Sequence, residues 1–238
     1  MQDVTRLRLA SSALITIDLQ RDTLDGQPLE IPGTSAVLPQ VARLCNAFRS
    51  AGAPVIHVVR LYRSDGSNAE LCRQELVKTG GPVLQPGTTG RLLAGEILGP
   101  EASDLDDELL LEGGVQQLGT AEFVVYKPRW GAFYQTALQA LLDALAIDSL
   151  VFVGCNFPNC PRTSIYEASE RDFRVALVAD AVSGLYDRGE AELLNIGVAI
   201  SSTEDVIELL GGLQLARSPL ASRENSADDR EIRSSAQG

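Results

Sequence analysis

The sequence contains a single histidine, which excludes any site built on several histidine ligands, including most zinc hydrolase sites. Positive charge is also scarce, with 20 Lys and Arg residues against 32 Asp and Glu residues. The resulting net charge of -12 argues against nucleic-acid and membrane partners, which require a basic surface. No apolar run reaches the roughly 18 residues of a membrane span, and residues 1–12 lack the apolar core of a signal peptide. We therefore expect a cytoplasmic protein.

Cysteine is sparse as well, with four residues in 238. They could form two disulfides, but a chain of this length with 45% hydrophobic residues can build a core without them. In a reducing compartment we expect free thiols. A disulfide between Cys155 and Cys160 remains open as a redox alternative.

Short apolar runs alternate with amphipathic segments along most of the chain. The pattern predicts strands at residues 13–18, 54–59, 123–126, 150–153, 175–178 and 198–201. It predicts helices at 36–51, 134–145, 163–173, 190–197 and 203–210, the last one capped by Thr203. This alternation indicates a three-layer α/β/α fold with a mostly parallel six-stranded sheet in Rossmann-like order.

Two segments depart from the alternation. Residues 61–121 are rich in Gly, Pro and polar residues, with short helices expected only at 69–77 and 106–111. An insertion of this length at the end of a strand is typical of a lid or a subunit contact. We therefore predict one domain at residues 1–214 containing this insertion, followed by a disordered, serine-rich tail of mixed charge at 215–238.

The segment from 149 to 180 carries the strongest chemical signal. A buried strand stops at Gly154, and a helix begins near Cys160 before the next strand follows. Ligands of open α/β sheets bind at the carboxyl ends of strands, and a helix N-terminus there supplies positive potential. Because such a potential favours the thiolate, the sequence predicts a lowered pKa and a reactive thiol at Cys160.

Two charged residues follow other predicted strands at the same edge of the sheet. Asp18 ends the first strand and Lys127 follows the third. Alone, each has an ordinary explanation, as a loop-orienting carboxylate and as a strand-end lysine. Together with Cys160 they supply a nucleophile, a proton acceptor and a charge that tunes the thiol. Asp18 would accept the thiol proton and return it to a leaving group.

On these residues the chain resembles the isochorismatase-like cysteine hydrolases, which include nicotinamidases, N-carbamoylsarcosine amidase and ureidoacrylate amidohydrolase. The resemblance extends over residues 13–210. It rests on the strand that ends Ile17-Asp18-Leu19-Gln20, on the segment KPRWGAF at 127–133, and on Gly154 with Cys160 six residues later. It implies that Asp18, Lys127 and Cys160 form a catalytic triad and that the protein is a homo-oligomer, a dimer or a tetramer.

The resemblance also implies a cis peptide bond between Cys155 and Asn156. This bond would aim the N–H of Asn156 beside that of Cys160, forming an oxyanion hole. The nicotinamidase branch holds a metal through histidines after the second strand, whereas here His57 lies within that strand and has no second histidine near it. We therefore expect neither a metal nor a cofactor, and we interpret His57 as a core residue.

The substrate pocket is less well defined by the sequence. Its candidates are Gln20, Trp130, Phe133, Phe157 and Arg162. The aromatic members could equally pack in the core, and Arg162 faces either the substrate or a neighbouring loop. A carboxylate-bearing substrate is suggested by Arg60, Arg63, Arg129 and Arg162, although arginines near loops are commonly solvated or paired.

These observations favour a metal-independent hydrolase that cleaves a C–N bond of amide, carbamoyl or ureide type in a small molecule through a thioester at Cys160. Two alternatives stay open. One is hydrolysis of an isochorismate-type vinyl ether, which depends on the acid and needs no thiol. The other is a non-catalytic member of the fold that binds a small molecule or serves as a scaffold.

Overall fold

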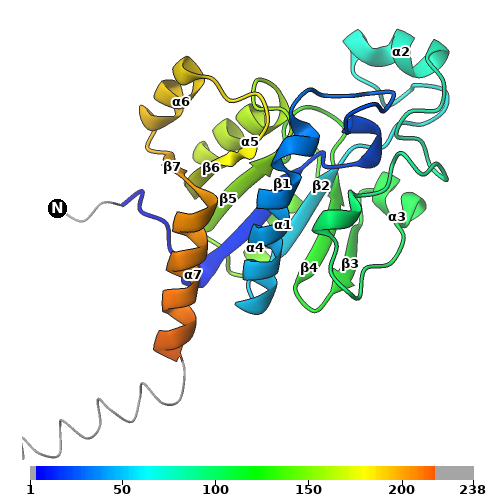
Figure 1. Cartoon of the computed structure of the whole chain (residues 1–238). Coiled ribbons are helices and arrows are strands. Elements are labelled where there is room, and N and C mark those ends of the chain that lie inside the picture. The colour runs from blue at the N-terminus through cyan, green and yellow to red at the C-terminus, as the bar shows by residue number, and fades with distance from the viewer. Residues whose placement is uncertain (1–3, 218–238) are drawn as a thin grey trace, which may run out of the picture.

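A central sheet of seven strands organises the computed structural model, which describes residues 4–217 (Figure 1). The strands are β1 (Ser12–Ile17), β2 (Val55–Val59), β3 (Val115–Gly119), β4 (Glu122–Tyr126), β5 (Ser149–Gly154), β6 (Arg174–Val182) and β7 (Ala199–Ser201). The helices are α1 (Thr34–Ser50), α2 (Gln74–Thr79), α3 (Asp107–Leu111), α4 (Leu138–Ala144), α5 (Cys160–Ser169), α6 (Asp187–Leu194) and α7 (Thr203–Arg217).

The strand order is β3-β4-β2-β1-β5-β6-β7, and every pair is parallel except β3 with β4. Without β3, the order is that of the classical Rossmann sheet, so the expected fold is confirmed. The prediction of six strands was wrong by one. Strand β3 lies inside the 61–121 insertion, and its polar sequence, VQQLG, buries only Gln116 and Leu118. The hydrophobic pattern of β3 in the sequence is therefore weak, because only one face of this edge strand is buried.

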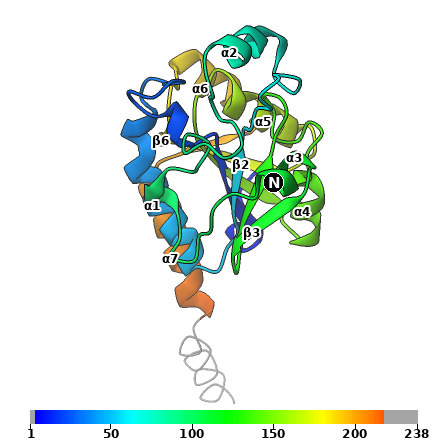
Figure 2. The ribbon, with the colours of Figure 1, turned by 90° about the vertical axis from the view of Figure 1, so that its right-hand side faces the viewer.

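Helices cover both faces of the sheet, as Figure 2 shows with α1 and α7 on one side and α4 and α5 on the other. Successive residues of β1 point to opposite faces. Leu14 joins the core beneath α1 and α7, whereas Ile15 and Ile17 join the core beneath α4 and α5. All six residues of β1 are buried, which is typical of a central parallel strand.

The register of the parallel strands determines where the site lies. Ile17 pairs with Gly154 on one side and with Val58 on the other, and Val59 pairs with Tyr126. The residues that follow these strand ends therefore meet at one edge of the sheet. The helix α2 lies beyond this edge, at the top of both views (Figures 1 and 2).

Several helix ends differ from the sequence-based prediction. Helix α5 begins at Cys160 instead of residue 163, because Pro161 fits the first turn, where its missing N–H costs no hydrogen bond. Helix α4 begins only at Leu138, since residues 134–137 form turns. Thr203 does not cap α7 with its side chain. Ser202 and Asp205 form a reciprocal capping pair instead, with N–O distances of 3.0 and 3.2 Å.

The predicted tail falls almost entirely outside the described residues. Helix α7 continues to Arg217, and residues 218–238 lie beyond the part of the chain that the structure describes. Among residues 4–217, no helix is long and apolar enough to cross a membrane. The four cysteines are free thiols, and Cys72 is the exposed one.

The histidine lies in β2 with 0% exposure, at the centre of a buried polar chain. The hydroxyl of Thr16 lies 2.8 Å from its Nδ1, and its Nε2 lies 2.8 Å from Glu122 Oε1. Arg49 binds the same carboxylate through two nitrogens, at 2.7 and 2.8 Å. Burial lowers the pKa of His57, so the ring is neutral and Nε2 donates to Glu122. His57 is thus a structural residue, as the sequence indicates.

This arrangement predicts a loss of stability on mild acidification. The pKa of His57 lies below its usual value near 6.5 in the folded protein, so below that pH the unfolded chain binds a proton that the folded chain excludes. Stability should fall from pH 6.5 towards pH 5 by up to about 1.4 kcal/mol per pH unit. Urea unfolding at pH 7, 6 and 5 measures this slope.

The His57→Gln protein is the control for this effect. Because the chain has one histidine, removing it should flatten the stability profile between pH 6.5 and 5. An unchanged slope in His57→Gln would show that another group takes up the proton.

Candidate active site

Three side chains from separate elements meet at the carboxyl edge of the sheet. Asp18 follows β1, Lys127 follows β4, and Cys160 is the first residue of α5. The Lys127 Nζ lies 2.8 Å from Asp18 Oδ2 and 3.2 Å from Cys160 Sγ. All three are buried: the exposed fraction is 0% for Lys127, 7% for Asp18 and 5% for Cys160. The structure therefore brings together the three residues that the sequence selects.

The backbone at Asp18 is held in an unusual conformation. Its φ of 52° lies in the left-handed region, which costs a non-glycine residue of order 1–3 kcal/mol and persists where the surroundings enforce it. Its N–H donates to Val58 O at 3.0 Å, and its carbonyl accepts from Thr23 Oγ1 at 3.0 Å and Cys155 Sγ at 3.3 Å. These contacts from three other segments fix the direction of the carboxylate.

Gly154 is the residue of β5 that lies beside this turn. Its φ is 119°, and a Cβ added there would lie 2.3 Å from the carbonyl oxygen of Ile17. Any side chain must therefore push β5 away from β1 directly below Asp18. Only glycine allows the two strands to approach this closely while adopting that conformation.

We expect Gly154→Ala to lower the free energy of unfolding by about 3 kcal/mol or more, because the strained φ and the clash with Ile17 add. The displaced Asp18 should also reduce any turnover. Chemical denaturation of the variant measures the first effect. Gly95→Ala is the matched control, since a Cβ there meets nothing within 4 Å. Equal stability of the two variants would contradict the argument.

The thiol does not have the lowered pKa that the sequence predicts. Burial and the charge of Asp18 raise the pKa of Cys160 to about 11, and Lys127 offsets only part of this. Burial is the main cause, and a thiolate would also place a second negative charge beside Asp18 with a single ammonium between them. Cys160 is therefore protonated at neutral pH. The Asp18 Oδ1 atom is buried and accepts no hydrogen bond from the described residues, so it can take the thiol proton.

Two backbone N–H groups belong to residues that border the same cavity, Asn156 and Cys160. The peptide bond between Cys155 and Asn156 is cis, as the resemblance implies. Within residues 4–217, the N–H groups of Asn156 and Cys160 donate to no protein acceptor, whereas the neighbouring N–H of Phe157 donates to Ser183 O at 2.7 Å. Both N–H groups are thus available to a bound oxygen.

A cavity of about 390 Å³ opens above these groups. Its floor contains Asp18, Cys155, Asn156 and Cys160, and its walls are Thr23, residues 27–31, Arg60, Arg73, Leu76 and Leu84. The last three belong to the 61–121 insertion, which therefore covers the site of its own chain. This volume suits a small molecule.

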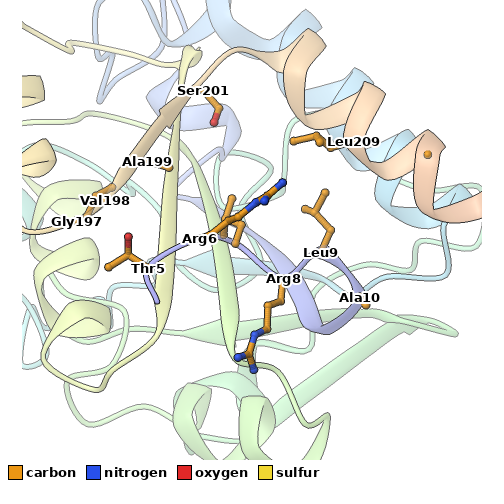
Figure 3. A pocket seen from close by; sticks show the side chains of 12 residues that line it. Thr5, Arg6, Arg8, Leu9, Ala10, Gly197, Val198, Ala199, Ser201 and Leu209 are labelled. Carbon is orange, nitrogen blue, oxygen red and sulfur yellow. The ribbon is translucent and has the colours of Figure 1, made fainter. Parts of the chain in front are cut away.

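A second cavity, of about 760 Å³, lies between the N-terminal segment, β7 and α7 (Figure 3). Residues 5–10, residues 197–199, Ser201, Leu209 and Gly212 line it. It is larger, but its lining includes none of the three converging side chains and consists mostly of apolar residues. The smaller cavity is therefore the candidate active site.

None of the five residues predicted to line the pocket borders this cavity. Gln20 is completely buried and binds the backbone of Arg60 and Arg91 with its amide group. Trp130 packs its ring against the guanidinium of Arg73, at 4.9 Å. Gln20 and Trp130 thus contact Arg60 and Arg73, which line the cavity, without lining it themselves. Sequence analysis identified the right segments but not the direction of these side chains.

The remaining three pocket candidates have structural contacts. Phe133 and Phe157 are core residues, the latter packed edge-on against Tyr186. Arg162 forms an ion pair with Glu192 outside the cavity. Sequence analysis missed Arg73, because the short helix expected at 69–77 gave no sign that it would lie against the cavity.

The fold is that of the isochorismatase-like cysteine hydrolases. The family model "Isochorismatase domain" matches residues 12–205, and the chain therefore belongs to this family. A solved structure, an isochorismatase family protein from Desulfovibrio vulgaris, superposes with a TM-score of 0.72. It is 28% identical to this chain and covers 84% of it, and the match spans 98% of that chain.

Two curated relatives carry contrasting names. Maleamate amidohydrolase of Pseudomonas putida is 29% identical over 86% of this chain and 86% of its own length. A protein of Arabidopsis thaliana is named "Probable inactive nicotinamidase" and is 28% identical over 80% of this chain and 92% of its own length. The named relatives thus include both an amidohydrolase and a protein described as probably inactive.

Proposed function

We propose that this chain is an amidohydrolase that cleaves a C–N bond of a small molecule through a thioester at Cys160. The observation that carries the proposal is that Lys127 Nζ contacts both Asp18 Oδ2, at 2.8 Å, and Cys160 Sγ, at 3.2 Å, where Asp18 and Cys160 border the cavity of about 390 Å³. A nucleophile, a proton acceptor and a buried positive charge are thereby within reach of one substrate carbonyl.

The first half of the reaction forms the thioester. Asp18 takes the proton of the Cys160 thiol as the sulfur attacks the amide carbonyl carbon. The carbonyl oxygen becomes an oxyanion, which the N–H groups of Asn156 and Cys160 bind. As this intermediate collapses, the C–N bond breaks, and Asp18 passes its proton to the departing nitrogen, which leaves as ammonia or an amine.

The second half restores the enzyme. Water enters the place of the amine, and Asp18 takes one of its protons as the oxygen attacks the thioester carbon. The C–S bond then breaks, the acid product leaves, and the sulfur regains the proton from Asp18. Lys127 Nζ, 3.2 Å from the sulfur, stabilises the thiolate form of Cys160 at each proton transfer.

A substrate screen tests the proposal. Primary amides, carbamoyl compounds and ureides are incubated with the protein, ammonia release is measured, and isochorismate is assayed in parallel. We expect ammonia from at least one amide-type compound and none when Cys160→Ala replaces the native protein. Turnover confined to isochorismate would assign the ether hydrolysis instead, and a protein inert to all compounds would be a binding member of the family.

A further inference from the structure

The guanidinium of Arg60 is buried in the candidate site with two nitrogen atoms unpaired. Arg60 is 2% exposed and borders the cavity. Its Nη2 lies 2.5 Å from both Glu70 Oε1 and Arg129 O, whereas Nε and Nη1 have no hydrogen-bond partner among the described residues. Arginine does not lose its charge in proteins, and unpaired buried donors are rare. These donors therefore indicate a missing acceptor.

Other residues fix Arg60 in this place. The Gln20 side chain accepts from the Arg60 N–H at 2.8 Å and donates to its carbonyl at 2.9 Å. Because Gln20 follows β1 and Arg60 follows β2, this double contact ties together the two strand ends beside Asp18. The backbone of Arg60 is therefore held in place by buried contacts next to the sheet.

The buried charges around Arg60 do not cancel. Arg73 also borders the cavity and donates to the hydroxyl of Tyr62 at 3.1 Å, and that hydroxyl donates to Glu70 Oε2 at 2.9 Å. Glu70 is thus shared by two arginines, while Asp18 and Lys127 neutralise each other. One positive charge remains in excess. The other acid of the lining, Glu30, is exposed and accepts from the N–H of Gly26.

We propose that Arg60, with Arg73 beside it, binds a carboxylate of the substrate, so that the substrate is a small amide carrying a carboxylate away from the scissile C–N bond. A carboxylate is planar, carries the missing charge and accepts from guanidinium groups with short, strong hydrogen bonds. A cavity of about 390 Å³ holds such a molecule with its amide at Cys160. This inference rests on the proposed amidohydrolase function.

Matched substrates test the inference. Malonamate, succinamate and glutaramate each carry one amide and one carboxylate, and the corresponding diamides replace the carboxylate by a neutral group of similar size. We expect kcat/KM for at least one monoamide to exceed that of its diamide by about 100-fold, the range of a hydrogen-bonded charge pair. The Arg60→Met protein should reduce this ratio below about 5-fold.

Arg63→Met is the control variant. Arg63 lies three residues further along the chain, is exposed and does not border the cavity, so its removal changes the net charge equally. The ratio should stay as in the native protein. If Arg60→Met does not fold because Glu70 loses its ion pair, Arg60→Met/Glu70→Gln removes both charges and is measured instead. An unchanged ratio in the folded Arg60 variant overturns the inference.

A binding measurement separates this inference from the proposed function. Malonate, succinate and glutarate are titrated into Cys160→Ala and into Cys160→Ala/Arg60→Met by calorimetry. Binding that needs Arg60, together with no amide turnover by the native protein, supports the carboxylate site and rejects the hydrolase. Amide turnover without a preference for the monoamides, and without dicarboxylate binding, supports the hydrolase and rejects the carboxylate site.

Discussion

Cys160→Ala should lose amide turnover by about 10⁴-fold or more, since no other residue can form the covalent intermediate. Cys155 also borders the cavity, but it is completely buried and its Sγ contacts the carbonyl oxygen of Asp18 at 3.3 Å. Burial and the charge of Asp18 raise the pKa of Cys155 further than that of Cys160. It cannot replace the nucleophile.

The fold should survive this substitution, because alanine is a good helix former and the small side chain of Cys160 adds little to the core cluster that it joins. Intact-mass measurement of the native protein during turnover should show an acyl adduct, and peptide mapping should place it on Cys160. Cys72→Ala, which removes the exposed thiol, is the control and should keep both turnover and adduct. Full activity in Cys160→Ala would reject the thioester.

The main features of the fold could be predicted because they depend on local patterns. Each parallel strand is a short apolar run closed by a polar or glycine residue, and six such runs with helices between them predict a mostly parallel sheet covered on both faces. The same logic located Asp18, Lys127 and Cys160, since residues after neighbouring parallel strands must share an edge. Strand β3 escaped prediction because its pairing with β4 is decided by tertiary contact.

The pocket could not be predicted because side-chain direction beyond a strand end has no period. Gln20 was expected to face the substrate, yet its amide satisfies the backbone of Arg60. In the sequence, Arg60 was one of four arginines that could equally bind a substrate carboxylate. The structure distinguishes it by its burial and its unpaired donors. The prediction of a lowered pKa for Cys160 was wrong for a related reason. A helix N-terminus is visible in the sequence, whereas the burial of Cys160 beside Asp18 is not.

The protonated resting thiol leads to a prediction in which reactivity and catalysis separate. Asp18→Asn removes the negative charge that helps to raise the pKa of Cys160, so Lys127 then acts on the sulfur without opposition and the pKa falls. The thiolate fraction at pH 8 should rise, and iodoacetamide should alkylate Cys160 faster than in the native protein. Turnover should nevertheless fall by about 10⁴-fold, because no group remains to protonate the leaving nitrogen.

Lys127→Met is the matched comparison, with the opposite expected effect on the reactivity of the Cys160 thiol. It removes the charge that lowers the pKa of Cys160, so alkylation should slow while turnover is lost to a similar degree. It also leaves the carboxylate of Asp18 buried without its partner, which should cost about 3–5 kcal/mol of stability. Alkylation rates are followed by mass spectrometry in a Cys72→Ser background, and kcat by ammonia release. If Asp18→Asn kept its activity together with a more reactive thiol, Lys127 alone would activate Cys160, and Asp18 would not be the group that moves the proton.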